Sequence, residues 1–203
     1  MHCGGNSTKT QRVLLATECR MALKEWATVL EAMARGEQLV LIRKGGLIEP
    51  GSGFELQANT FVFYPTFEHQ AVNYLRPPYR AYFDEALRRR AAEGQVRVEL
   101  CGVAVSSVSS HDPDLVERLS PTHIYNQAFL TQRLKWQPQQ PLTIVVVQAF
   151  RLAHALTLNV LPHYAGCKSW VGLGAPLSLE GAAPVISDEQ FRQRAHELQT
   201  LLA

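Results

Sequence analysis

Apolar residues recur every three to four positions in several stretches of the chain, and this spacing predicts amphipathic helices. The first such stretch begins at Met21, and its apolar face comprises Leu23, Trp26, Ala27, Leu30 and Met33. Gly36 follows it and is expected to end the helix. Later helices are predicted over residues 78–92, 112–119, 124–136 and 187–202, the last with the capping box Ser187-Asp188-Glu189-Gln190.

Continuous apolar runs, and runs in which apolar and polar residues alternate, predict strands. Three short runs, over residues 38–42, 54–57 and 61–64, suggest a small antiparallel meander. Residues 96–105 alternate and predict one long, bent strand with a bulge at Gly102. The most apolar segment, Leu142–Leu152, is expected to be the central strand of the sheet.

Together these elements predict a single α+β domain in which helices pack on a mixed or mainly antiparallel sheet. A PUA-like barrel is one arrangement of such a sheet that fits the pattern. The 203 residues suffice for one domain with a substantial core. Residues 1–20 are expected to be an N-terminal extension, either disordered or ahead of a true start at Met21, and residues 21–203 to form the domain.

The charge of the chain is nearly balanced, and this limits the possible partners. The net charge is +2, from 20 basic and 18 acidic residues, which excludes the general polyanion-binding surface of a histone or a ribosomal protein. Any nucleic-acid site must therefore be a local patch. No apolar run reaches the roughly 20 residues that cross a bilayer, so we expect no membrane partner and a cytoplasmic location.

The cysteines are scattered and support neither a disulfide framework nor a thiolate metal site. Cys3, Cys19, Cys101 and Cys167 form no C-x-x-C pair, and we expect them to be free thiols. Walker, Rossmann, nucleophile-elbow and zinc-metalloprotease motifs are also missing from the sequence. We therefore expect no metal site and no cofactor.

A basic turn is the first candidate ligand site. Arg43 and Lys44 leave a predicted strand and are followed by Gly45 and Gly46. Two cations and the backbone amides of a glycine turn could converge on a phosphate. The alternative is an ordinary hairpin turn in which Gly45 supplies a positive φ, and the sequence leaves both interpretations open.

A dense polar segment follows the strand at residues 61–64. Tyr64, Thr66, Glu68 and His69 place a phenol, a hydroxyl, a carboxylate and an imidazole close together in a region where functional groups often lie. Ligand binding by Tyr64, Thr66 and His69 is one interpretation, and a weaker one makes Glu68 and His69 an acid–base pair. The structural alternative is a turn that Thr66 and Glu68 cap and His69 braces.

A third candidate lies near the C-terminus. Lys168 could bind phosphate and Trp170 could stack on a base, although a tryptophan at such a position is more often part of the core. Cys167 follows His163 by four positions, but no third partner is evident for a metal site or a catalytic triad. Residues 88–90, three arginines in sequence, are most simply a solvated helix face that could extend a basic groove.

Several segments resemble a bacterial family known as domain of unknown function 1802. The resemblance rests on Ala22–Trp26, Arg43–Gly46, Tyr64–Thr66, Glu68–Gln70 and Gly166–Trp170, and it extends over nearly the whole chain from Met21 onward. The family supplies a name without a mechanism. Because some of its members occur beside restriction-endonuclease-like domains, the resemblance implies a DNA-related context.

One spacing is similar to the G-x-K-x-x-E-x-R signature of RNA-associated ASCH domains, which are PUA-like barrels. Gly36 and Arg43 occupy the first and last positions, whereas Gln38 and Leu41 replace the lysine and the glutamate. The D/E-x-K pair of the PD-(D/E)XK nucleases is missing, because the nearest matches, Glu55 and Glu68, are each followed two positions later by glutamine.

Three functional hypotheses therefore stand. The leading one is a nucleic-acid or nucleotide-phosphate binding module, with Arg43 and Lys44 on phosphate and Tyr64, His69 and Trp170 lining the pocket. The second is a divergent metal-dependent phosphodiesterase or nuclease that uses Glu68 and His69. The third is a protein-interaction scaffold. The sequence does not decide whether the chain is an enzyme.

Overall fold

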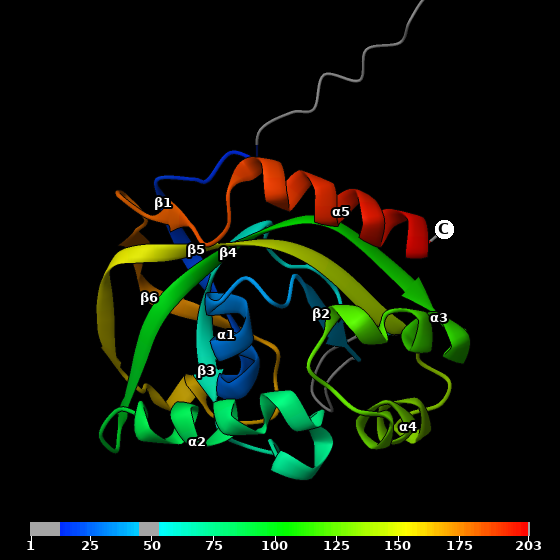
Figure 1. Ribbon diagram of the computed structural model, residues 1–203. Coiled ribbons are helices and arrows are strands. Elements are labelled where there is room, and N and C mark those ends of the chain that lie inside the picture. The colour runs from blue at the N-terminus through cyan, green and yellow to red at the C-terminus, as the bar shows by residue number, and fades with distance from the viewer. Residues whose placement is uncertain (1–12, 45–52, 203) are drawn as a thin grey trace, which may run out of the picture.

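The computed structural model describes residues 13–44 and 53–202 of the chain (Figure 1). Seven strands form one sheet, in the order β2-β5-β4-β3-β1-β6, with β7 paired to β5. The strands are β1 (Glu18–Trp26), β2 (Val40–Arg43), β3 (Thr60–Thr66), β4 (Gln95–Ser110), β5 (Leu142–Asn159), β6 (Trp170–Ser178) and β7 (Ala183–Pro184). The α-helices are α1 (Ala27–Ala34), α2 (Arg80–Arg88), α3 (Pro113–Arg118), α4 (Gln127–Lys135) and α5 (Asp188–Leu202).

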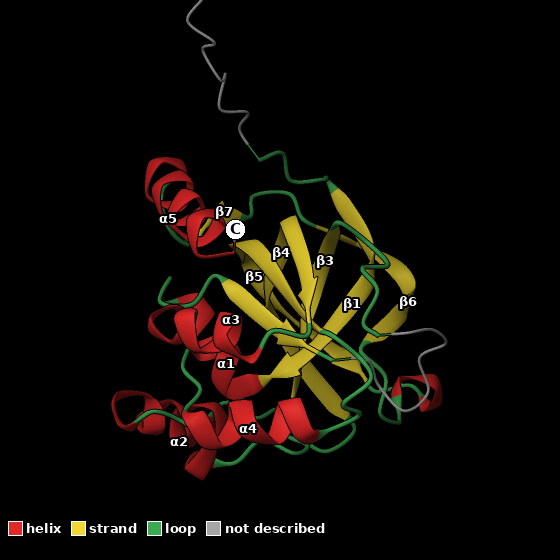
Figure 2. Ribbon diagram, turned by 90° about the vertical axis from the view of Figure 1, so that its right-hand side faces the viewer, coloured by secondary structure: helices red, strands yellow, loops and turns green. Residues whose placement is uncertain are grey.

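The sheet is mixed and mainly antiparallel, which confirms the predicted α+β class. The pair of β1 and β3 is parallel, with Ala22 opposite Val62, and the other strand pairs of the described residues are antiparallel. Along the ordered path the sheet ends at β2 and β6, so it curls without closing into a barrel. The long strands β4 and β5 arch over α1, and Figure 2 shows α1 to α4 gathered on one side of the sheet.

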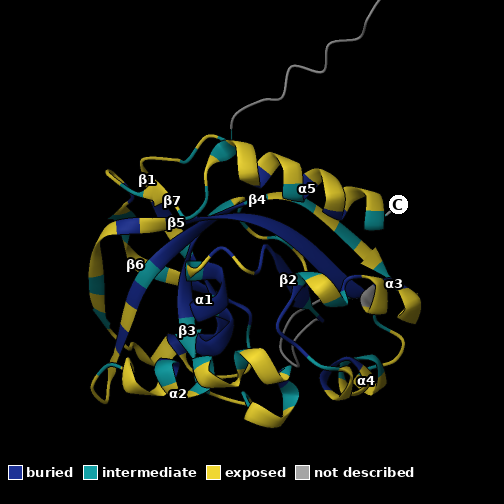
Figure 3. Ribbon diagram, viewed as in Figure 1, coloured by how far each residue is buried: buried dark blue, intermediate teal, exposed yellow. Residues whose placement is uncertain are grey.

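Both faces of the sheet are covered, and two apolar clusters result. One lies between the sheet and the helices and includes Leu23, Val29, Phe63 and Phe129. The other lies on the opposite face around Ala22, Val62, Tyr64, Val98 and Tyr164. In Figure 3 the middle of β5 and almost all of α1 are buried. Ala22 and Leu23 are successive residues of β1 and belong to different clusters, because side chains of a strand point alternately to its two faces.

The helix predicted from Met21 is wrong in its first half. β1 occupies Glu18–Trp26, including part of the predicted N-terminal extension, and α1 starts only at Ala27. Since β1 pairs on both edges and both Ala22 and Leu23 are fully buried, its apolar residues do not alternate and mimic helical spacing. The predicted stop is confirmed, because Gly36 has a φ of 70° and its amide bonds to the carbonyl of Met33 at 3.0 Å.

The predicted meander is also wrong. Residues 54–57 form no strand, β2 pairs with β5, and β3 lies between β1 and β4. Strand pairing here depends on distant segments, and adjacency in sequence therefore misled the prediction. The long strand β4 is confirmed, but its irregularities lie at Val98/Leu100 and Ala104/Ser106 rather than at Gly102. Gly102 instead makes room for Val147, because a Cβ there would lie 2.7 Å from the Val147 Cγ1 atom.

The remaining helices agree with the sequence apart from their lengths, whereas β6 and β7 were not predicted. The strand predicted over Leu142–Leu152 is β5, although it lies second from the β2 edge rather than at the centre. The capping box is confirmed, since the Gln190 amide donates to the Ser187 Oγ atom at 3.2 Å. Cys19, Cys101 and Cys167 are free thiols, and Cys3 lies outside the described residues. None of the described helices is both long and apolar enough to cross a membrane.

Candidate functional site

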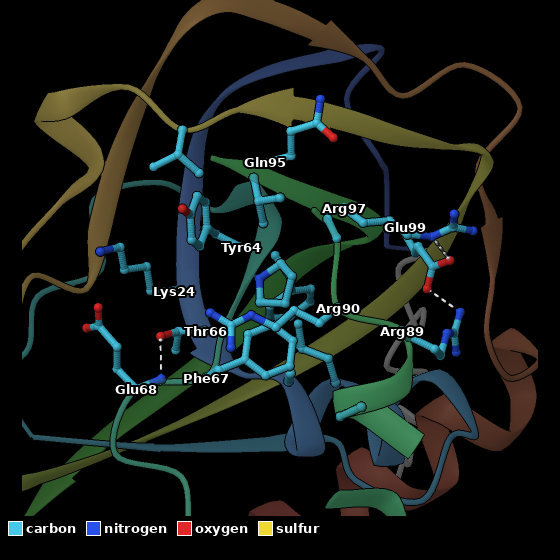
Figure 4. Close-up of a pocket in the computed structure, with 18 of the residues that line it drawn as sticks. Lys24, Tyr64, Thr66, Phe67, Glu68, Arg89, Arg90, Gln95, Arg97 and Glu99 are labelled. Carbon is cyan, nitrogen blue, oxygen red and sulfur yellow. Dashed lines mark hydrogen bonds and ion pairs between the residues drawn. The ribbon is translucent and has the colours of Figure 1, made fainter. Parts of the chain in front are cut away.

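A groove of about 700 Å³ lies at one end of the sheet, beneath the end of α2. The ends of β1 and β3 form its floor, the start of β4 and the segment that joins α2 to β4 form one wall, and residues 160–165 contribute to the other. Figure 4 shows side chains from all of these elements directed toward the groove. The lining carries the cations Lys24, Arg89, Arg90 and Arg97 and the carboxylates Glu31, Glu68, Glu93 and Glu99.

At one end of the groove the charges neutralise one another. Arg89 donates hydrogen bonds to Glu31 and Glu99, and the Nε atom of Arg97 donates to Glu99 at 2.8 Å. Glu31 also accepts from Arg35 at 2.8 Å, so the network ties α2 to α1 and β4. Burial alone would raise the pKa of Glu99, but the hydrogen bonds from Arg97 and Arg89 outweigh it and lower that pKa. At this end the cations and carboxylates are therefore paired with one another, and little charge is available to a ligand.

The opposite end holds a lysine, a tyrosine and a carboxylate that remain separate. The ammonium of Lys24 lies 5.5 Å from the centre of the Tyr64 ring and donates to the carbonyl of Gly166 at 3.1 Å. Figure 4 shows the carboxylate of Glu68 on the same side of the groove as this ammonium. Lys24 and Glu68 form no ion pair in the described structure, so their opposite charges face each other across a gap.

The surroundings shift the proton affinities of this end. Burial lowers the pKa of Lys24, an effect that the charge of Glu68 opposes and the charge of Lys168 reinforces. Burial also raises the pKa of Tyr64, and Glu68 and Tyr164 raise it further. Titratable groups whose pKa values are shifted within a cleft are characteristic of functional sites.

Between the two ends lies a cation stacked on an aromatic ring. The guanidinium of Arg90 lies 5.0 Å from the centre of the Phe67 ring. Arg90 is exposed and forms no ion pair with any residue of the ranges described, unlike its neighbour Arg89. The groove therefore offers an aromatic face, an unpaired guanidinium and a partly buried ammonium along one path.

A sequence profile of the family described as Domain of unknown function (DUF1802) matches residues 22–197. This chain belongs to that family. The match confirms the resemblance seen in the sequence, and every residue that lines the groove lies within it.

Two solved structures are similar to this DUF1802 chain in fold. One is a serine-to-alanine mutant of ZmASCH from Zymomonas mobilis, with 12% identity, a TM-score of 0.42, and coverage of 88% of this chain and 94% of that one. A tyrosine-to-phenylalanine mutant of the same protein has 10% identity and a TM-score of 0.43, and the match covers 86% and 96% of the two chains. Similarity this distant carries no argument about the site. No curated protein sequence matches the chain.

The structure brings part of the predicted polar segment of this DUF1802 chain into the groove. Tyr64, Thr66 and Glu68 line it, and the amide of Glu68 donates to the Thr66 Oγ atom at 3.2 Å, as predicted for a turn. Lys168 interacts electrostatically with Lys24, while its own ammonium donates to a backbone carbonyl. His69 is exposed, has a φ of 62°, and is not one of the lining residues.

Arg43 and Lys44 of the predicted basic turn lie elsewhere and serve internal contacts. Arg43 donates to the carboxylate of Glu25 at 3.1 Å, and Glu25 is only 4% exposed. Lys44 donates to the carbonyls of Arg133 and Leu134, at 2.9 and 3.2 Å, where α4 ends. Burial lowers the pKa of Lys44, and the charge of Arg133 lowers it further. Gly45 and Gly46 lie outside the described residues.

Trp170 lies in the core, as its alternative interpretation expected. Its indole nitrogen donates to the carbonyl of Glu55 at 2.9 Å, and its ring packs against Phe54 and Phe61. With 5% of its surface exposed, Trp170 has no free face for a base.

Sequence reasoning missed Lys24 and Phe67 as site residues, and it named Arg90 only within an arginine run that could extend a basic groove. Lys24 fell within a predicted helix but not on its apolar face, because β1 was not recognised. The available signal was that Lys24 directly follows the apolar run Met21–Leu23. Among the described residues no group of three His, Cys, Asp or Glu could hold a metal ion, so Glu68 and His69 do not belong to such a set.

Proposed function

We propose that this DUF1802 chain is a binding module for nucleic acid or for a nucleotide phosphate, and that the groove is its binding site. The observation that carries the proposal is the presence in one groove of two cations that are not paired with carboxylates, Arg90 and Lys24, with the aromatic ring of Phe67 against the Arg90 guanidinium. Phosphates need cations that are free to bind, and bases need an aromatic face.

The charge balance of the groove supports this choice of residues. Arg89 and Arg97 are already held by Glu31 and Glu99, so a phosphate would have to displace a carboxylate to reach them. Arg90 and Lys24 have no such competitor among the described residues. A local patch of this kind also agrees with a net charge of only +2, because a nearly balanced charge gives the rest of the surface little attraction for a polyanion.

The size and polarity of the groove also support the proposal. Its volume of about 700 Å³ falls within the range of roughly 300 to 1,000 Å³ that is typical of ligand pockets. Phe67 is partly exposed, and it lies under a guanidinium, an arrangement in which a base can stack on the ring or on the guanidinium plane. A nucleotide or a short single-stranded segment fits these dimensions.

The test is fluorescence anisotropy with single-stranded and duplex DNA and RNA at two salt concentrations. Arg90→Ala is expected to weaken binding and to reduce the slope of log affinity against log salt by about 0.7 to 1, the loss of one phosphate contact. Arg88→Ala is the matched control, since Arg88 is an exposed arginine at the end of α2, two residues before Arg90, and does not line the groove.

Two outcomes would overturn the proposal. The first is a wild-type protein that binds none of the probes at low salt, which would favour the protein-interaction scaffold. The second is an equal loss of affinity in Arg88→Ala and Arg90→Ala, because nonspecific attraction to the outer face of α2 would then explain the binding.

A further inference from the structure

The end of the groove that holds Lys24, Tyr64 and Glu68 has the layout of a proton-transfer centre. We propose that these three residues cleave single-stranded RNA by transesterification of a phosphodiester bound in the groove. The inference rests on the proposed function, since the substrate must first bind there. It adds an activity that needs neither a metal nor His69.

The first step of the argument is the gap between the charged groups. Glu68 and Lys24 interact electrostatically, and Glu68 also acts on Tyr64, so the three groups face a common space (Figure 4). Here the two partners remain apart in the described structure, and the space between them opens into the groove. A phosphodiester there would have a proton acceptor on one side and a proton donor on the other.

The second step concerns the spare hydrogen-bonding capacity of Lys24. An ammonium has three N–H donors, and the described residues accept from Lys24 only once, through the carbonyl of Gly166. The remaining donors have no acceptor among the described residues, and Figure 4 shows the Glu68 carboxylate on the same side of the groove as this ammonium. Because burial lowers the pKa of Lys24, its ammonium gives up a proton more readily than that of an exposed lysine. It can therefore protonate a leaving oxygen.

The third step concerns Tyr64, which is 9% exposed and reaches the groove from β3. Its raised pKa keeps the phenol neutral and therefore a hydrogen-bond donor. The hydroxyl forms no hydrogen bond with the described residues, and its ring is fixed edge-on against Tyr164, at 6.1 Å between ring centres. A fixed, unused donor beside the gap is suited to a non-bridging phosphate oxygen, on which negative charge develops during the reaction.

The chemistry available to these groups determines the class of substrate. In the proposed step Glu68 accepts the proton of a ribose 2′-hydroxyl, the 2′-oxygen bonds to the adjacent phosphorus, and the bond from phosphorus to the 5′-oxygen breaks. Lys24 donates a proton to that leaving oxygen. The products are a 2′,3′-cyclic phosphate and a 5′-hydroxyl, and a proton passes from Glu68 to Lys24 through solvent to restore both. Because RNA carries its own nucleophile, a proton acceptor and a proton donor suffice.

The experiment separates binding from cleavage. The wild-type protein is incubated, with a chelator present, with a fluorescent single-stranded RNA and with the DNA of the same sequence, and both affinity and strand length are measured. We expect both probes to bind and only the RNA to be cut, with a cyclic phosphate end. Glu68→Gln should slow cleavage by about 100-fold or more while affinity changes little. Glu117→Gln, which changes an exposed carboxylate of α3 outside the groove, is the control and should cleave at the wild-type rate.

Further readouts distinguish a catalytic role from a structural one. Lys24→Met and Tyr64→Phe should slow cleavage with thermal unfolding close to that of the wild type, and Lys24→Arg, which keeps the positive charge but cannot give up a proton, should bind RNA without restoring cleavage. The pH–rate profile of Glu68→Gln should lose the limb that reports the proton acceptor. Uncut RNA that still binds would overturn this inference and leave the proposed function standing, whereas failure of both probes to bind would overturn both. Cleavage at the same rate in Glu68→Gln would overturn the assignment of Glu68.

Discussion

The chain contains two groups of basic residues whose charged groups have different surroundings in the folded protein. Arg43 and Lys44 lie at the end of β2, and their charged groups are held by Glu25 and by the carbonyls that end α4. Lys24 and Arg90 lie in the groove, and neither is paired with a carboxylate of the described residues. The difference shows that the internal acceptors supplied by the fold determine which cations remain available to a ligand.

The two groups should also differ in what they contribute to stability. Glu25 accepts hydrogen bonds from the amide of Trp26 and from Arg43, and both ionic side chains of this pair are largely removed from water. Breaking such a pair leaves a buried charge without its partner. Arg90, which is exposed, has nothing comparable to lose.

The largest effect is expected from Arg43→Met. We predict a decrease of about 3 to 5 kcal/mol in the free energy of unfolding, because Glu25 would remain buried and unpaired. Urea denaturation of the purified variant measures this. Arg90→Met is the control and should change the free energy of unfolding by no more than about 0.5 kcal/mol. Equal losses in the two variants would erase the distinction between the groups.

An intermediate effect is expected from Phe67→Ala, which tests whether the groove cations act together with an aromatic face. Loss of base stacking should weaken binding of a single-stranded probe by about 1 to 3 kcal/mol. Trp136→Ala serves as the control, since Trp136 is an exposed aromatic residue outside the groove. Unchanged affinity in Phe67→Ala would mean that the ring is not a stacking surface.

The smallest effect concerns the pH dependence of stability. Burial lowers the pKa of Lys24 in the folded chain below its usual value of 10.5, so the unfolded chain binds more protons in the interval between the two values. The free energy of unfolding of the wild type, relative to Lys24→Met, should therefore rise as the pH increases toward 10.5. Chemical denaturation at several alkaline pH values measures the difference, and a fall with pH would contradict the assigned shift.

The predictions from sequence succeeded where the determining interactions are short in range. The capping box at Ser187 and the glycine stop at Gly36 each depend on contacts within a few residues. The apolar run of β5 was equally clear, because a strand covered on both faces needs little else to be recognised. β1 was misassigned for the same reason, since a short strand buried on both faces has no alternation to distinguish it from a helix.

The candidate site was only partly accessible from the sequence. Tyr64, Thr66 and Glu68 follow one another on and just after β3, so their density was visible without a structure. Lys24 comes from β1 and Arg90 follows α2, and no local pattern connects either residue with β3. Their proximity arises from the parallel pairing of β1 with β3 and from the ionic network that anchors α2.

The sequence by itself determined the α+β class, the family, and the helix caps, because each of these depends on composition or on neighbouring residues. The tertiary structure decided which charges are available to a ligand. Arg43 and Lys44 have internal partners on β1 and α4, whereas Lys24, Glu68 and Arg90 line one groove and form no ion pair with the described residues. Whether a charged side chain is paired depends on residues far away in the chain, and only the fold brings those residues into contact.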